Sequence, residues 1–276
     1  MKTVIAMLVF VAIAMSGAVL PSIAAGVQST ATVPQAAIAL PRWKAAQAVA
    51  LAAHTDIAKG GILAAKPHVL DLEQVLAHAD RSFAAAVSGS GTIYVLADGQ
   101  AEADLAARNS GQIPGAAGRK VMPVGNPYRY IGFVLGSYYN EIGRSTEALR
   151  VLDAGLALPG AVPGMMVGEQ LPELISERGA ALNALKRWPD ALAAYDSGLT
   201  IEVLKAGDRG RLLRGRGFAL TELDRLDEAE AAYRESLTVE PNNTLALKEL
   251  NYIARIRTGA ARSPSVLLMP GASKPR

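Results

Sequence analysis

Three glycines, Gly136, Gly179 and Gly217, are each followed by the same kinds of residue at the same distances. Each copy has a large side chain three residues on, an alanine twelve on, a large side chain sixteen on and a small residue nineteen on. In the order of the copies, these positions are Tyr139, Leu182 and Leu220; Ala148, Ala191 and Ala229; Leu152, Tyr195 and Tyr233; and Gly155, Gly198 and Ser236. A pattern that recurs three times is an internal repeat, and it constrains the architecture more than any local feature does.

The spacing within a copy has a mechanical meaning. Ala191, Tyr195 and Gly198 follow an i, i+4, i+7 pattern, which places two small residues around a large one on a single helix face. The glycine with its partner three residues later marks a face of a preceding helix, and a short polar turn separates the two helices. Small residues let two helices approach closely, so each copy is predicted to be an antiparallel helical hairpin.

At residues 214–243, where the pattern is most complete, the chain resembles the tetratricopeptide repeat (TPR) family. The resemblance covers residues 128–243 and implies a mainly α fold, an α-solenoid of antiparallel helix hairpins over 128–160, 172–204 and 210–243. A helix over 244–257, with Leu247, Leu250, Ile253 and Ala254 on one face, is predicted to cap the array. Residues 258–276 are expected to form a flexible tail.

The repeat spacing departs from the usual period. The three glycines are 43 and 38 residues apart, whereas the family repeats about every 34 residues. The first excess falls in the Pro- and Gly-rich segment 159–168, which is expected to loop out. The second falls around 204–209, where we expect a lengthened second helix and a turn.

The N-terminus has the pattern of a secretory signal peptide. Lys2 precedes an apolar run that extends to Leu20, and small residues follow Pro21. Residues 1–25 are therefore predicted to be removed on export, most naturally to a periplasm, after which no membrane span remains. The alternative is an uncleaved helix that anchors the chain.

Residues 26–127 give weaker patterns and are predicted to be mostly helical after a flexible lead over 27–41. Helices are expected over 43–58, 71–87 (with Asp71 as its cap) and 101–108. Short strands are expected over 92–96 and 120–124, with Pro123 placing the second at a sheet edge. These strands form either a small βαβ-like element or extended loops packed on degenerate helical repeats.

No residue pattern for catalysis, a metal or a cofactor is found. His54, His68 and His78 lack the close helical spacing of a metal site. Asp98, Glu102 and Asp104 are expected on a solvated helix face rather than as an acid–base pair. The net charge of +3 is a small excess that does not indicate nucleic-acid binding.

The TPR resemblance implies a concave groove lined by the first helix of each hairpin, which receives a protein or a peptide. The candidate groove residues are Tyr130, Phe133, Ser137, Asn140 and Glu141 in the first copy; Glu173, Glu177 and Asn183 in the second; and Arg211, Arg214, Phe218 and Thr221 in the third, with Asn242 and Asn243 at the rim.

Two roles are expected within this set. Arg211 and Arg214 are placed to hold a carboxylate, unless they only face water. Asn140 and Asn183 are placed to bond the backbone of an extended peptide. A family subclass binds chaperone carboxyl termini through a clamp of lysine, asparagine and arginine, and this chain matches that clamp only at Arg211.

Three classes of function fit these observations. The first is an exported, noncatalytic scaffold that binds a protein or peptide, for example in cell-envelope assembly. The second is an enzyme or ligand-binding protein whose site lies in 26–127 and whose repeats recruit the partner. The third is a structural repeat protein that associates with itself.

Overall fold

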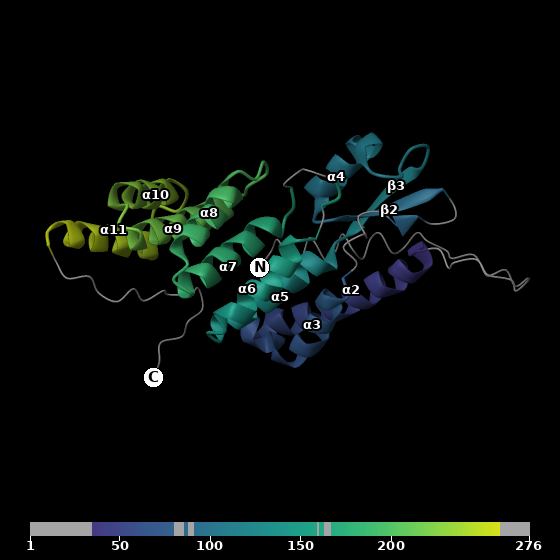
Figure 1. Ribbon diagram of the computed structural model, residues 1–276, viewed down its shortest axis with the longest axis horizontal. Helices are drawn as coiled ribbons and strands as arrows, with labels where there is room; N and C mark the ends of the chain where they lie inside the picture. Colours follow the sequence, from purple (N-terminus) through teal and green to yellow (C-terminus); the bar gives the residue numbers. More distant parts are fainter. Residues whose placement is uncertain (1–34, 80–85, 88–90, 159, 163–166, 260–276) are drawn as a thin grey trace, which may run out of the picture.

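The computed structural model describes residues 35–79, 86–87, 91–158, 160–162 and 167–259. Helices dominate it, and the hairpins predicted from the repeat follow one another along the molecule, with a small sheet at the end near the N-terminal helices (Figure 1). The predicted signal peptide, the 27–34 part of the lead and most of the predicted tail lie outside the described residues.

The three predicted hairpins are confirmed. Their first helices are α5, α7 and α9, their second helices are α6, α8 and α10, and α11 follows the third hairpin. The bounds are α5 Pro127–Glu141, α6 Ser145–Leu156, α7 Leu171–Ala184, α8 Trp188–Leu199, α9 Ala206–Glu222, α10 Leu226–Val239 and α11 Thr244–Arg257. The chain therefore has a TPR-like fold of antiparallel helical hairpins.

Each repeat glycine faces the large side chain of its own second helix. A Cβ added at Gly179 would lie 2.4 Å from the ring of Tyr195, and one at Gly217 would lie 2.8 Å from the ring of Tyr233. In the first hairpin a Cβ at Gly136 would lie 2.4 Å from Leu152. No side chain fits in these spaces, so the glycines set the distance between the two helices of each hairpin.

The turns of the three hairpins are also copies of one another. Seven residues after each repeat glycine, the chain has a left-handed residue: Gly143 (φ 75°), Lys186 (φ 58°) and Asp224 (φ 62°). The next residue is always an arginine, whose backbone N–H donates to the carbonyl five residues earlier. These arginines pair with an acid three residues on, in the pairs Arg144–Glu147, Arg187–Asp190 and Arg225–Glu228.

Ion pairs also join successive hairpins. Arg178 Nε on α7 lies 2.6 Å from Asp153 on α6. Asp196 on α8 accepts from Arg216 on α9 at 2.7 Å. The arginine before the second and the third repeat glycine thus contacts the preceding hairpin, because α7 and α9 each pack between two second helices.

The helix predicted over 244–257 is present as α11 and packs on the third hairpin, although its apolar face is not the predicted one. Ala246 and Ile253 are buried against α9 and α10, and Leu250 packs beside them. Leu247 and Ala254 were predicted on this face, but both are exposed. Asn243 starts the helix by accepting from the backbone N–H of Ala246.

The spacer segments follow the predicted loops only in part. The described residues between α6 and α7 are not helical, as expected for 159–168. The second excess was assigned to a lengthened second helix, which is wrong: α8 has 12 residues, whereas α9 has 17 and begins at Ala206.

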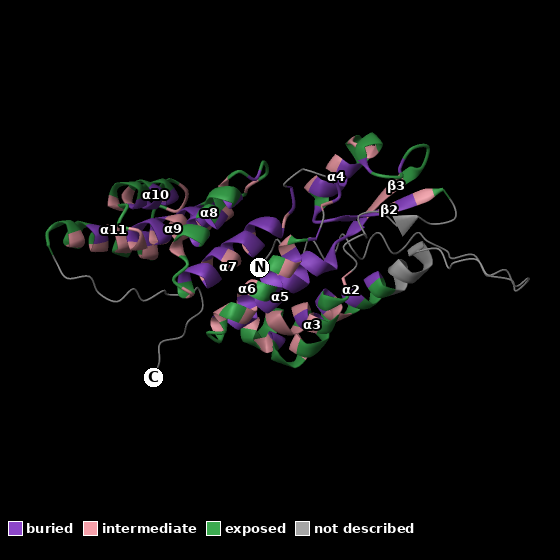
Figure 2. Ribbon diagram, viewed as in Figure 1, coloured by how far each residue is buried: buried purple, intermediate pink, exposed green. Residues whose placement is uncertain are grey.

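Before the hairpins come α2 (Gln35–Gly60), the 3₁₀ helix η1 (Ile62–His68) and α3 (Val69–Ala77). All three pack on α5, so that most of α5 is buried (Figure 2). Trp43 fixes α2 by donating its indole N–H to the Gly125 carbonyl at 2.9 Å.

The bounds of these helices differ from the predicted ones. Residues 35–41 were expected in a flexible lead but are helical. Asp71 lies within the first turn of α3 rather than at its cap. The helix predicted over 71–87 ends at Ala77, and residues 86–87 form a strand.

The two predicted strands are confirmed, and they form the βαβ-like alternative. Strand β2 (Thr92–Ala97) pairs in parallel with β3 (Lys120–Gly125), and α4 (Gln100–Arg108) and the 3₁₀ turn η2 (Ser110–Gln112) connect them. The short strand β1 (Ala86–Val87) adds on the other side of β2, antiparallel to it. Pro123 therefore lies on an edge strand, as predicted, opposite Val95.

Among the described residues, no helix combines the length and apolar character that a membrane span requires.

The glycine contact gives a direct test of the packing. We expect Gly179→Ala to lower the free energy of unfolding by about 1–3 kcal/mol, because the new methyl group overlaps the ring of Tyr195. The control is Gly207→Ala in α9, where a Cβ meets nothing within 4 Å. The control should leave stability unchanged or raise it by up to about 1 kcal/mol. Equal effects in urea unfolding would contradict the packing described here.

Candidate functional site

The first helices carry a series of equivalent side chains on the side away from their second helices. Tyr130, Glu173 and Arg211 each precede their repeat glycine by six residues. Successive residues in a helix are about 100° apart, so these side chains lie about 240° around the helix from the glycine. Because each glycine faces its second helix, these three side chains point away from that helix. We call the surface of α5, α7 and α9 that carries them the first-helix face, with Phe133, Ser137, Asn140, Glu177 and Phe218 as its other members.

Tyr130 is buried at the α2 end of this face. Its hydroxyl lies 3.0 Å from Nδ1 of His54 on α2, and the two rings meet edge to face. Burial lowers the pKa of His54 from its ordinary value. The sequence pattern did not assign His54 to the site, since α2 belongs to no recognisable repeat; α2 extends the face by one helix.

Asn140 joins α5 to α7. Its Nδ2 donates to the Glu177 backbone carbonyl at 3.0 Å and to Glu177 Oε2 at 2.9 Å. Asn140 is only 5% exposed, and its Oδ1 has no hydrogen-bond partner in the described structure. Burial raises the pKa of Glu177, and the neighbouring Asn140 and Ser137 side chains oppose this rise. Phe133 is partly buried on the core that α5 shares with α2 and α3.

Glu173 and Glu177 lie one turn apart on α7, in surroundings that disfavour their charged forms. Burial is the main cause that raises the pKa of Glu173 to about 7, with Asp208 adding to the effect. Burial also raises the pKa of Glu177. The Arg211 charge opposes both shifts, although no ion pair to either carboxylate is found among the described residues.

The other predicted site residues have structural contacts or lie at the surface. Arg214 was expected to hold a ligand carboxylate with Arg211, but its Nη1 lies 2.7 Å from Glu240. Asn183 was expected to bond a peptide, yet it is buried and its Nδ2 donates to the Tyr195 hydroxyl at 3.3 Å. Of the remaining members, Phe218 and Glu141 are half-buried, Thr221 is buried, Asn242 is exposed and Asn243 caps α11.

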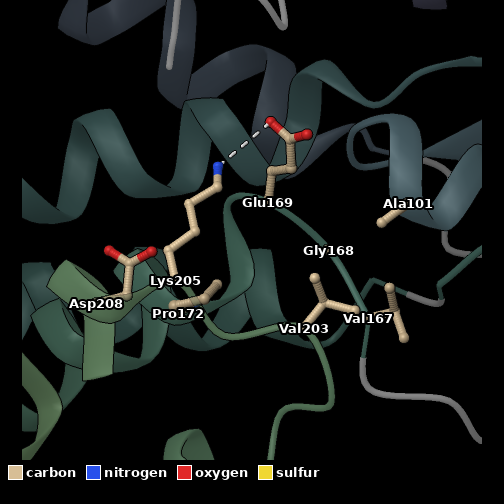
Figure 3. Close-up of a pocket in the computed structure, with 8 residues that line it drawn as sticks. All are labelled: Ala101, Val167, Gly168, Glu169, Pro172, Val203, Lys205 and Asp208. Carbon is tan, nitrogen blue, oxygen red and sulfur yellow. Dashed lines mark ion pairs between the residues drawn. The ribbon is translucent and has the colours of Figure 1, made fainter. Parts of the chain in front are cut away.

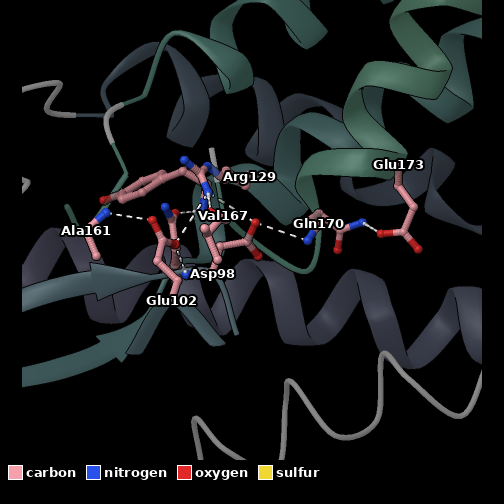
Figure 4. Close-up of polar contacts among 9 residues, drawn as sticks. Asp98, Glu102, Arg129, Ala161, Val167, Gln170 and Glu173 are labelled. Atoms are coloured by element: carbon pink, nitrogen blue, oxygen red, sulfur yellow. Dashed lines mark hydrogen bonds and ion pairs between the residues drawn. The ribbon is translucent and has the colours of Figure 1, made fainter. Parts of the chain in front are cut away.

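A buried charge cluster lies at the end of β2, where the sequence predicted a solvated face. Asp98, Glu102 and Arg129 are 0%, 2% and 4% exposed, and Arg129 Nη1 lies 3.2 Å from Asp98 and 3.4 Å from Glu102 (Figure 4). Burial is the main cause that raises the pKa of Asp98 to about 6, although Arg129 opposes the shift. The prediction failed because α4 packs on β2 and β3, while Arg129 and the backbone of Ala161 and Gln170 cover Asp98 and Glu102. Asp104, which pairs with Gln100, is exposed.

The cluster holds the segment between the first two hairpins. Glu102 accepts from the backbone N–H of Ala161, and Asp98 accepts from that of Gln170 at 3.0 Å. Gly168 passes so close that a Cβ there would lie 2.4 Å from Asp98 Oδ2. Gln170 in turn donates to Glu173 through its side chain. The cluster therefore positions the start of α7 and, with it, the acidic part of the first-helix face.

A small cavity of about 50 Å³ lies next to this segment (Figure 3). The starts of α4, α7 and α9 enclose it with two loops, through Ala101, Val167, Gly168, Glu169, Pro172, Val203, Lys205 and Asp208. Glu169 and Lys205 face each other at 3.9 Å across its rim. The cavity has room for about one or two water molecules rather than for a substrate.

The three histidines do not gather. His54 contacts Tyr130, His68 pairs with Asp56 at 2.8 Å, and His78 contacts the Gln74 carbonyl. Within the part of the chain that the structure describes, no group of three or more His, Asp or Glu side chains could hold a metal ion.

Comparisons with known proteins give fold similarity to TPR domains. No protein-family model matches the chain, and no curated protein matches it. Among solved structures, the chain is similar to the first TPR domain of the human RPAP3 protein, at 23% identity and a TM-score of 0.41, over 48% of this chain and 94% of that one. It is also similar to the first TPR of Spaghetti (RPAP3) bound to the HSP90 peptide SRMEEVD, at 23% identity and a TM-score of 0.40, over 48% and 94%. A third similar structure is the second TPR domain of human RPAP3 in complex with the HSP70 peptide SGPTIEEVD, at 21% identity and a TM-score of 0.37, over 46% and 98%.

Removing the cation from the buried cluster tests its structural role. We expect Arg129→Met to lower the free energy of unfolding by about 3–5 kcal/mol, because two buried carboxylates lose their partner. The control is Arg150→Met, which breaks an exposed pair with Glu73 and should cost about 0–1 kcal/mol. A loss below 1 kcal/mol at Arg129 in chemical denaturation would show that the cluster does not hold the junction.

The pH dependence of stability tests the burial of Asp98. Its folded pKa of about 6 exceeds the reference value of 3.8, so the folded state binds this proton more tightly than the unfolded state does. The stabilisation is complete below about pH 4 and is lost as the pH rises through 6. We expect the Tm of the native chain to exceed that of Asp98→Asn by the largest amount at pH 4 and by a smaller amount at pH 7. A difference that grows with pH would mean that Arg129 outweighs burial.

Proposed function

We propose that this chain is a noncatalytic repeat module that binds a segment of a partner protein along the first-helix face. One observation carries the proposal. The positions that pack the hairpins together keep the same kind of residue in every copy, whereas the equivalent positions on the first-helix face change from tyrosine to glutamate to arginine. Glu173 and Arg211 are half-exposed and differ between copies, so they are not required for stacking and are available for recognition, whereas Tyr130 is buried against His54.

The polar groups of this face support an extended segment as the ligand. Asn140 Oδ1 is an acceptor without a partner in the described structure, and an N–H group of a bound peptide would satisfy it. Glu173, Arg211 and Phe218 lie on neighbouring helices of the same face and offer an acid, a base and an aromatic ring. Such a series can read successive side chains of one peptide.

The hydrogen bonds that the buried carboxylates of Asp98 and Glu102 already make support a noncatalytic role. Asp98 and Glu102 already accept from the backbone N–H groups of Gln170, Ala161 and Asp98 itself. The adjoining cavity of about 50 Å³ is far smaller than a typical substrate site.

Export to a periplasm and a role in cell-envelope assembly complete the proposal. The basic start, apolar run and small residues of 1–25 support it. N-terminal sequencing of the protein recovered from cells tests the export step: a new terminus close to Ala25 is expected, whereas an intact Met1 would favour the anchored alternative.

A selection experiment tests the binding function. A library of unstructured peptides is selected on the full chain, and the enriched peptides are titrated into isotopically labelled protein. We expect the largest amide shift changes in α5, α7 and α9 and smaller ones in α6, α8 and α10. Failure to enrich any peptide, or shift changes confined to the second helices or the sheet, would contradict the proposal.

A further inference from the structure

We infer that the first-helix face recognises a lysine or arginine side chain of its partner, held between Glu173, Glu177 and Asn140. This inference rests on the proposed function and adds the chemical class of the ligand. It differs from the expectation drawn from the sequence, which assigned a ligand carboxylate to Arg211 and Arg214.

Most cations on or beside the first-helix face are already paired with acids of the same chain. Arg214 is paired with Glu240, and Lys205 lies 3.9 Å from Glu169. Among the described residues, Arg211 is then the remaining cation of the face. Its charge acts on Glu173 and Glu177, and Asp208 and Glu141 add negative charge next to these two carboxylates, so the face is acidic.

The two carboxylates of α7, those of Glu173 and Glu177, also favour a cation as the ligand. Glu173 and Glu177 are separated by four residues on α7, a spacing at which like charges repel. Each is partly withdrawn from water, and neither has an ion-pair partner within the described ranges. A cation placed between them would relieve both the repulsion and the loss of hydration.

The amide of Asn140 supports the same ligand without reference to charge. Asn140 is buried, and its amide lies against Glu177, with Nδ2 donating to Oε2 at 2.9 Å. This donation leaves Oδ1 of the same amide as an acceptor without a partner among the described residues. Each carboxylate accepts from one amide, Glu173 from Gln170 and Glu177 from Asn140, so the two carboxylates and the amide oxygen still have more acceptor sites than donors. Ammonium and guanidinium groups carry three and five N–H donors and no acceptor, and therefore complement such a set.

The neighbouring elements hold this set in place. Gln170 donates to the Glu173 carboxylate and is itself fixed through its backbone N–H by Asp98 (Figure 4). Tyr130, fixed by His54, bounds the set on the α5 side. Because these groups belong to the rigid junction, the acceptors are positioned before a ligand arrives, which limits the ordering cost of binding.

The test uses the peptides selected in the preceding section and their affinities measured by calorimetry. We expect lysine or arginine to be enriched at one position, and its replacement by glutamine to weaken binding at least tenfold. The variant Glu173→Gln/Glu177→Gln should lose a similar factor, and in this variant the peptide substitution should have little further effect. The matched control, Glu228→Gln/Glu235→Gln on α10, removes two exposed acids and should bind as the native chain does.

A further measurement keeps the inference falsifiable if the double variant folds poorly. The cation requires ionised carboxylates, so the affinity of the native chain should rise about tenfold between pH 6 and pH 8 as Glu173 ionises, with Asp98, Asp208, Arg211 and Lys205 acting on the same group.

The outcomes separate the inference from the proposed function. Peptides that bind the face without a basic residue, or whose affinity does not rise between pH 6 and pH 8, would overturn the basic-ligand inference and leave the binding function standing. Peptides that bind elsewhere, or none at all, would overturn both.

Discussion

The close approach of two helices at each repeat glycine is the constraint on which the rest of the structure depends. A single hydrogen atom at Gly136, Gly179 and Gly217 gives room for the large side chain of the opposite helix. This contact fixes the rotation of each first helix about its axis. It therefore decides which side chains pack between hairpins and which side chains, among them Glu173 and Arg211, lie on the first-helix face. The residues of this face can vary because the glycine contact, and not the face, sets how the helices pack.

The N-terminal region positions the start of α7 more than it offers a site of its own. The parallel pair β2–β3 ends at the buried cluster of Asp98, Glu102 and Arg129, and this cluster holds the segment that leads into α7. Such a cluster is costly by itself, since a carboxylate removed from water must be compensated. Here the compensation comes from one guanidinium and from backbone N–H groups far apart in the sequence. The result is a joint between the sheet, α5 and α7 that orients the acidic part of the first-helix face.

The repeat architecture could be predicted from the sequence because each hairpin depends on local spacing that occurs three times. The turn geometry was also readable: an arginine eight residues after each glycine, with an acid three residues later, recurs in every copy. The burial of Asp98 and Glu102 could not be predicted, because their partners Arg129, Ala161 and Gln170 lie far along the chain and no periodicity links them. The pairing of Arg214 with Glu240 was missed for the same reason, and with it the acidic character of the face. His54 joined the face only through the packing of α2 on α5.

The central claim is that the first-helix face binds a partner segment through an acceptor set on α5 and α7. The most direct measurement is a crystal structure of the full chain with its tightest selected peptide. The account predicts a peptide that crosses α5, α7 and α9, with a lysine or arginine nitrogen within hydrogen-bond distance of Glu173, Glu177 and Asn140 Oδ1. A peptide seated on the second helices or on the sheet, or one that places a carboxylate on Arg211 and leaves the two glutamates without a cation, would contradict it.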